Sequence, residues 1–166
     1  KKEDIVPSST DPFLRKTTLQ GFVHDEASAF FGGLAGNAGL FSTARDVARV
    51  YQMLLNGGEI DGQRYLSKET CQLFTTETSK ISRRGLGFDK PDADDPKKGN
   101  CAPAAPAEVY GHTGFTGTCA WVDPVNELVY VFFSNRIYPD VTNRKLNQLH
   151  IRERIQGAIY DAMKKK

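Results

Sequence analysis

The segment from Gly111 to Thr118, Gly-His-Thr-Gly-Phe-Thr-Gly-Thr, carries residue types that suit an active site. It lies between two stretches whose residues favour β-strands, 108–110 and 119–122. Glycines at the end of a strand allow a ligand to approach the backbone closely. Acyl transfer needs an activated hydroxyl, a proton shuttle and N–H donors aimed at the developing oxyanion, and a strand ending in His112, Thr113 and Gly114 meets the third need. The alternative interpretation is that His112 fills a turn beside two glycines.

Other polar residues are weaker candidates. His24 and the two acids after it are metal-ligand types, but neighbours on an extended chain point to opposite faces, which favours a structural role. Segment 30–39 is dense in glycine without Walker spacing, and this predicts a backbone that passes the rim of an active site. Within it, Asn37 is either a substrate-binding residue or a left-handed turn residue. Arg136 either meets a substrate carboxylate or anchors a loop with its neighbour, and Thr116 is a further substrate-binding candidate. We expect no metal and no cofactor.

Composition excludes several functional classes. The 22 basic and 20 acidic residues give a net charge of +2, and no basic stripe interleaved with aromatics points to nucleic acid. No apolar run approaches the ~20 residues of a membrane span. Three cysteines without Cys-x-x-Cys spacing argue against a disulfide scaffold and a zinc site. The alternatives are one disulfide with a leftover thiol, or Cys71 and Cys119 as small buried hydrophobes, and the second is the favoured interpretation. The 166 residues fit one domain or a large lobe, and a start without Met and without a signal peptide suggests an internal fragment.

Regular elements must position these residues. The clearest helix is capped by Ser42 or Thr43 and ends at Asn56-Gly57-Gly58, and Ser67 caps a shorter one. The run 129–133 is apolar throughout, as in a central strand covered on both faces. The predicted order is an irregular cleft-rim segment (1–41), a helical segment (42–75), a region of strands (84–134) and a C-terminal helix (143–163). Within the region of strands we expect an edge strand at 84–88, a polar excursion at 89–107 and a hairpin of 118–123 with 128–134.

Several of these pieces, in this order, resemble the C-terminal half of the serine β-lactamase-like hydrolases, the superfamily of class C β-lactamases, penicillin-binding proteins and esterases. The pieces are Gly-Leu-Phe-Ser-Thr-Ala-Arg-Asp (39–46), Leu-Asn-Gly-Gly (55–58), His-Thr-Gly (112–114), Trp-Val-Asp-Pro (121–124) and a terminal helix. His-Thr-Gly is similar to the Lys-Thr-Gly signature of that superfamily, with His in place of Lys. The pieces at 23–26 and 35–39 also resemble the branch fused to glycosidase modules in some secreted bacterial proteins.

The resemblance implies a fold of the α/β (α+β sandwich) type, with a mixed, mostly antiparallel sheet flanked by helices, here as a partial β-lactamase/transpeptidase-like fold. It implies that His112 stands where the family has Lys, that Thr113 and Gly114 match directly, and that the Phe115 N–H completes the oxyanion hole. A histidine is mostly neutral near pH 7, which favours esters or peptides over penicillins. The implied location is periplasmic or otherwise extracytoplasmic, in the bacterial cell envelope.

Two family motifs are missing from these residues. Neither Ser-x-x-Lys, which carries the nucleophile, nor Tyr-x-Asn or Ser-x-Asn occurs. We therefore expect a substrate-clamping wall whose partners are a small ester, peptide or β-lactam-like substrate, the missing N-terminal half of the fold and, for the isolated piece, a second copy in a homodimer. The alternative is a non-catalytic module of the same fold that binds glycan or peptide.

Overall fold

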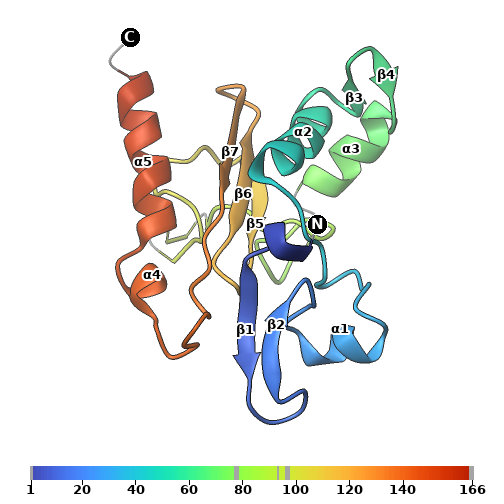
Figure 1. Ribbon diagram of the computed structural model, residues 1–166. Helices are drawn as coiled ribbons and strands as arrows, with labels where there is room; N and C mark the ends of the chain where they lie inside the picture. The colour runs from blue at the N-terminus through green and yellow to red at the C-terminus, as the bar shows by residue number, and fades with distance from the viewer. Residues whose placement is uncertain (1, 77–78, 93, 96–97, 165–166) are drawn as a thin grey trace.

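The computed structural model describes residues 2–76, 79–92, 94–95 and 98–164, and it has three layers. A three-stranded antiparallel sheet of order β5-β6-β7 forms the middle layer. Helix α2 (Ala44–Leu55) lies on one face of the sheet, and α5 (Ile151–Met163) lies on the other (Figure 1). The strands are β5 (Tyr110–Thr113), β6 (Cys119–Asp123) and β7 (Leu128–Phe132). Helices flanking an antiparallel sheet confirm the expected fold class.

The apolar strand of the predicted hairpin is not the central one. The hairpin itself is confirmed, because β6 pairs with β7 from Cys119↔Phe132 to Asp123↔Leu128. The middle strand, however, is β6, which is buried along its whole length. Strand β7 lies at the edge of this sheet, and its apolar run is explained by the helices over both of its faces. A continuous apolar run shows that both faces of a strand are buried, and it does not show whether the strand lies in the centre or at the edge of the sheet.

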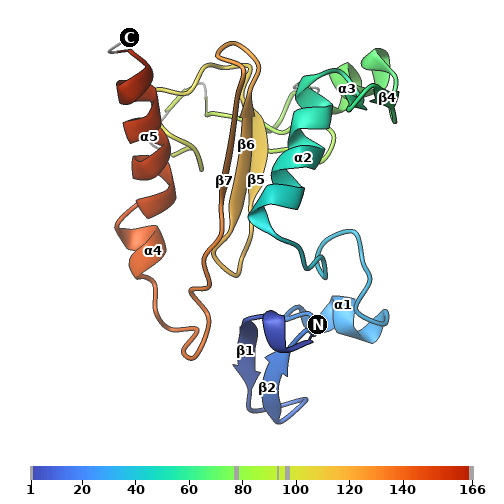
Figure 2. The ribbon, with the colours of Figure 1, turned by 45° about the horizontal axis from the view of Figure 1, so that its top comes forward.

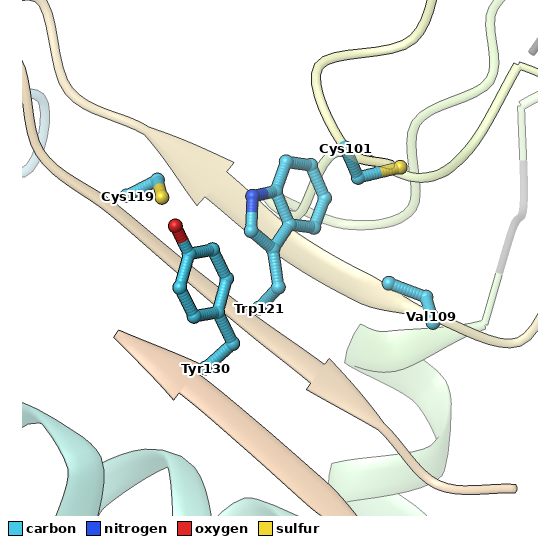
Figure 3. Packing of buried hydrophobic residues seen from close by; sticks show 5 residues of the cluster. All are labelled: Cys101, Val109, Cys119, Trp121 and Tyr130. Atoms are coloured by element: carbon cyan, nitrogen blue, oxygen red, sulfur yellow. The ribbon is translucent and has the colours of Figure 1, made fainter. Parts of the chain in front are cut away.

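The core lies between the sheet and α5. Figure 3 shows its cluster of buried residues gathered around the Trp121 indole: Cys101, Val109, Cys119, Trp121 and Tyr130. Tyr160 of α5 donates its hydroxyl to the Asp123 carboxylate at 2.8 Å, and the Tyr130 hydroxyl donates to the Arg152 carbonyl at 3.1 Å. All three cysteines are buried and free, so the prediction for Cys71 and Cys119 is confirmed.

Helix α2 begins and ends where the sequence predicts. The Thr43 side chain accepts a hydrogen bond from the Asp46 N–H at 3.1 Å, which satisfies one of the first-turn donors. Gly57 and Gly58 follow the helix with φ of 66° and 95°, a conformation that glycine adopts without steric cost. The predicted short helix is α3 (Lys68–Thr75), capped by Ser67. Between the two helices lies a small hairpin of β3 (Glu59–Ile60) and β4 (Gln63–Arg64).

Segment 1–41 is more regular than predicted. After a 3₁₀ turn, η1 (Lys2–Asp4), strands β1 (Pro7–Asp11) and β2 (Thr17–Gln20) form an antiparallel hairpin. A short helix, α1 (Glu26–Phe30), follows. The Asp11 carboxylate organises the hairpin turn by accepting hydrogen bonds from three successive backbone N–H groups, those of Phe13, Leu14 and Arg15. Such side-chain-to-backbone bonds produce regular structure without an apolar period.

Two further predictions differ from the structure. The predicted C-terminal helix is divided into α4 (Lys145–Gln148) and α5 by His150, whose φ of 49° lies in the left-handed region and interrupts the helix. No strand forms at 84–88. Instead, Asp89 alone makes a bridge to β5 through Gly111.

The β1–β2–α1 unit lies beyond one end of the sheet (Figure 2) and is joined to it by Asn135, whose amide donates to the carbonyls of Pro7 and Ser8.

Candidate active site

The open edge of the sheet lies at the end of β5. Gly111 and Asp89 exchange two backbone hydrogen bonds. The Gly111 N–H donates to the Asp89 carbonyl at 3.0 Å, and the Asp89 N–H donates to the Gly111 carbonyl at 2.7 Å. The N–H and carbonyl of Gly111 therefore point away from β6. Backbone groups of alternate residues in a strand point the same way, so those of Thr113 also point outward. Asp89 covers the edge beside Gly111 only. The outward Thr113 N–H can therefore donate to a further extended chain, whereas the Thr113 carbonyl already accepts from the His112 ring at 2.7 Å.

A tight turn follows this edge directly. The Gly114 N–H donates to the Thr118 carbonyl at 2.8 Å, and the Gly117 N–H donates to the Gly114 carbonyl at 3.0 Å. A Cβ on Gly114 would lie 2.2 Å from the Thr118 hydroxyl oxygen, so glycine leaves the turn undisturbed where a side chain would not. The Phe115 N–H makes no hydrogen bond within the described part of the chain. It is a backbone donor available to a ligand.

The contacts of His112 define its protonated nitrogen. Its Nδ1 lies 2.7 Å from the Thr113 carbonyl oxygen, and its Nε2 lies 2.9 Å from Nη1 of Arg84. A carbonyl can only accept and a guanidinium can only donate, so Nδ1 carries the proton and Nε2 accepts. His112 in this arrangement is a neutral imidazole. Nothing in the sequence spacing pointed to Arg84, which lies 28 residues before its partner.

A basic cavity of about 520 Å³ adjoins the strand end. Thr113, Gly114 and Phe115 line it on the sheet side, and its other lining residues are Lys98, Gly99, Asn100, Arg136, Asn147, His150, Arg152 and Glu153. Burial, with the neighbouring charges of Arg152 and Arg144 as a smaller cause, lowers the pKa of Arg136 below its usual range. A bound anion would reverse that effect, because it favours the charged guanidinium. The cavity thus suits a ligand with a negative group.

The structure brings together only part of the predicted site. Thr116 is absent from the cavity lining, and its carbonyl accepts the Arg136 N–H at 2.8 Å. Asn37 also lies outside the cavity lining, where its side-chain oxygen accepts from the Ser28 hydroxyl at 3.0 Å and its amide donates to the Asp25 carboxylate. In this position Asn37 secures the first turn of α1.

His24 has a contact that the sequence did not indicate. Its ring stacks on that of Phe115, with centroids 5.4 Å apart and an interplanar angle of 8°. The described residues hold no group of three or more His, Cys, Asp or Glu side chains arranged to bind a metal ion. No spacing rule joins residues 24 and 115, because the contact depends on how the β1–β2–α1 unit meets the sheet.

Burial makes the three cysteines poor candidates for a nucleophile. Burial raises the pKa of Cys101 to about 12 and that of Cys119 to about 11. Burial also raises the pKa of Cys71. Since the thiolate is the attacking species, these buried thiols are unreactive near neutral pH. The site described so far supplies backbone donors, a neutral imidazole and a basic cavity.

Comparison with known proteins gives the family. A sequence model described as Beta-lactamase matches residues 5–153. This chain belongs to the Beta-lactamase family. The match includes the β5 edge, the turn after it and Arg136, so the residues of the candidate site lie within the family's common region.

Curated relatives extend this result. A protein of Escherichia coli (strain K12) named "Putative D-alanyl-D-alanine carboxypeptidase" is 36% identical over 137 residues, which cover 82% of this chain and 31% of the relative. Proteins of the same name from Salmonella agona (strain SL483) and Salmonella typhi are also 36% identical over 137 residues, covering 82% of this chain and 32% of each relative. The chain thus spans about a third of the length of the relatives it matches.

Among its described residues, no helix is both long enough and apolar enough to cross a membrane.

Proposed function

We propose that this chain forms the substrate-binding and oxyanion-stabilising wall of a serine hydrolase of the Beta-lactamase family, and that the nucleophile lies in a part of the protein outside these 166 residues. The observation that carries the proposal is the pairing of the outward Thr113 N–H at the strand edge with an unbonded Phe115 N–H in the adjoining turn. An extended substrate can add to such an edge through backbone hydrogen bonds. Its scissile carbonyl would then lie beside the free donor.

The proposed substrate is a peptide or ester with a carboxylate near the scissile bond. Arg136 and Arg152 line the cavity next to Thr113, and among the described residues Glu153 is the only acidic side chain in its lining. The relatives named as D-alanyl-D-alanine carboxypeptidases agree with a substrate that ends in a free carboxylate. A guanidinium is well suited to bind that group, because its fork of N–H donors matches the two carboxylate oxygens.

His112 contributes a neutral hydrogen-bonding group in this proposal. With its proton on Nδ1 and Arg84 donating to Nε2, the ring brings no charge of its own to the strand end. Arg84 places a cation beside it instead. A substrate anion would therefore be attracted by arginines, whereas β-lactamases and penicillin-binding proteins with Lys-Thr-Gly have a lysine on the strand itself. Because the relatives' names point to peptides of the bacterial cell wall, the proposed location is periplasmic or extracytoplasmic.

The test uses the full-length protein. We expect its sequence to contain Ser-x-x-Lys and Tyr-x-Asn before Lys1, a fluorophosphonate probe to label that serine, and a peptide ending in D-Ala-D-Ala to release D-alanine. Arg136→Gln should raise KM for this peptide by about tenfold, the loss of one charged hydrogen bond, with a smaller change for the matching peptide amide. Lys164→Gln, at the end of α5, is the control.

Three results decide between the candidates. Absence of both motifs, or no labelling and no turnover by the full-length protein, contradicts the hydrolase. Binding of the peptide or of a glycan without labelling favours the non-catalytic module. Equal effects of Arg136→Gln on acid and amide peptides contradict the role of the basic cavity while leaving the hydrolase in place.

A further inference from the structure

The ring of Phe115 is held by two planar side chains from different parts of the chain. His24, just before α1, stacks on it with centroids 5.4 Å apart. The Arg136 guanidinium carbon lies 4.4 Å from its centroid. The Phe115 residue is nevertheless 61% exposed, so apolar burial is not the main reason for its position. Its position is set mainly by aromatic and cation–π contacts, which depend on orientation.

His24 is itself fixed in place. Its Nδ1 lies 2.8 Å from the hydroxyl of Ser9, which is buried in β1. Its carbonyl accepts a hydrogen bond from Nη2 of Arg15 at 2.8 Å, and Nε of the same guanidinium binds Asp11 at 2.6 Å. The imidazole is thus anchored through both its ring and its backbone. It can act as a fixed surface against which another ring is positioned.

The position of this ring matters because Phe115 lies in the turn that carries the free donor. Ser134 donates to the Gly117 carbonyl at 2.7 Å, and Arg152 donates to the Thr118 carbonyl at 3.1 Å. These bonds hold the far end of the turn. At the near end of the turn, His24 and Arg136 contact the Phe115 ring. Because the ring is joined to the backbone at Cα, contacts that hold the ring also restrict rotation of the adjoining peptide group and its N–H.

We propose that His24 is a positioning residue that, by stacking on Phe115, fixes the direction of the Phe115 N–H in the oxyanion hole. This inference rests on the proposed function and adds to it a residue from the β1–β2–α1 unit. His24 touches neither the substrate nor the reacting atoms. Its role is to prevent misorientation of the donor, and a displacement of about 1 Å at a reacting centre can cost on the order of a hundredfold in rate.

The kinetic test compares two substrates in the full-length enzyme. His24→Ala should lower kcat for an oxoester about ten- to a hundredfold with little change in KM. The matching thionoester, whose sulfur is a poor hydrogen-bond acceptor, should lose much less. His24→Phe, which keeps a ring, should restore most of the oxoester rate, and Phe115→Leu should behave as His24→Ala does. Phe13→Ala is the control, since Phe13 is an exposed aromatic of the same unit without a ring contact among the described residues.

A second measurement is independent of turnover. The Gly114 and Gly117 amides donate within the turn, so their hydrogen exchange reports whether the turn is held. Exchange there should be faster in His24→Ala than in wild type or Phe13→Ala. Unchanged exchange, or equal losses for oxoester and thionoester, overturns the positioning role even in an active enzyme. An inactive wild type contradicts the proposed function alone, and the exchange result still decides the role of His24.

Discussion

At the scale of single residues, Gly114 connects the strand edge to the turn. Its N–H donates to the Thr118 carbonyl, and the space that a side chain would need is occupied by the Thr118 hydroxyl, 2.2 Å from where a Cβ would lie. The requirement at this position is for space, because the φ of Gly114 is not positive. A side chain at this position must displace the Thr118 hydroxyl or shift the turn, and a shift of the turn moves the neighbouring Phe115 N–H.

Gly114→Ala should therefore impair catalysis more than folding. Loss of one oxyanion-hole donor costs on the order of 3 kcal/mol, so we expect kcat/KM of the full-length enzyme to fall roughly a hundredfold. Its thermal midpoint should fall by only a few degrees. Steady-state kinetics and a thermal melt measure the two effects. Gly62→Ala is the control, because a Cβ there meets no atom within 4 Å although its φ of +74° adds some strain. A full rate in Gly114→Ala would remove this turn from the mechanism.

At the scale of elements, the β1–β2 hairpin supports the site through polar contacts. The Arg15 guanidinium beside Asp11, together with the backbone N–H groups of the turn, lowers the pKa of that carboxyl to about 2. The same guanidinium donates to the carbonyls of Val23 and His24 at 2.7 and 2.8 Å. The charge state of one aspartate is thereby linked to the segment that places His24 against Phe115.

We expect acid to weaken this hairpin first. A carboxyl whose pKa is lower in the folded than in the unfolded state stabilises the fold above the unfolded value of about 3.9, and the stabilisation is lost as pH falls toward 2. Asp11→Asn should remove this part of the pH dependence between pH 4 and 2. Hydrogen exchange at the Phe13–Arg15 amides as a function of pH is the measurement. Asp161→Asn, at an exposed ion pair of α5, is the control. Identical pH dependence in Asp11→Asn and wild type would show that Asp11 is not the group that titrates.

At the scale of the whole molecule, α1 and the loop after it carry several exposed large apolar side chains. Phe30, Phe31, Leu34 and Leu40 are between 79% and 87% exposed. We expect exposed apolar residues this close in the chain to belong to an interface, because large exposed apolar surface on a folded domain is typical of one. In the proposed full-length hydrolase, the rest of the protein would cover it.

The isolated 166-residue chain should therefore associate and be inactive. Light scattering should give a mass above that of the 18.4 kDa monomer, and the double variant Phe31→Asp, Leu34→Asp should lower it without loss of helical circular dichroism. No hydrolysis of p-nitrophenyl esters is expected, because no Ser-x-x-Lys is present. A clean monomer contradicts the interface. Ester hydrolysis that is lost in His112→Ala contradicts the assignment of the nucleophile to another part of the protein.

The sequence by itself determined the elements whose signals are local. The cap at Thr43, the glycines after α2, the β6–β7 hairpin and the strand that ends in His112 and Thr113 all follow from neighbouring residues. Their physical causes act within a few positions of the chain: capping bonds, left-handed glycines and the period of apolar side chains.

Only the tertiary structure decided which distant residues meet. The stack of His24 on Phe115, the donation from Arg84 to His112 and the basic cavity between Arg136 and Arg152 join residues that no spacing rule connects. It also placed β6 in the centre of the sheet and divided the last helix at His150. These features depend on how whole elements pack, and packing is a property of surfaces that form only after the local structure exists.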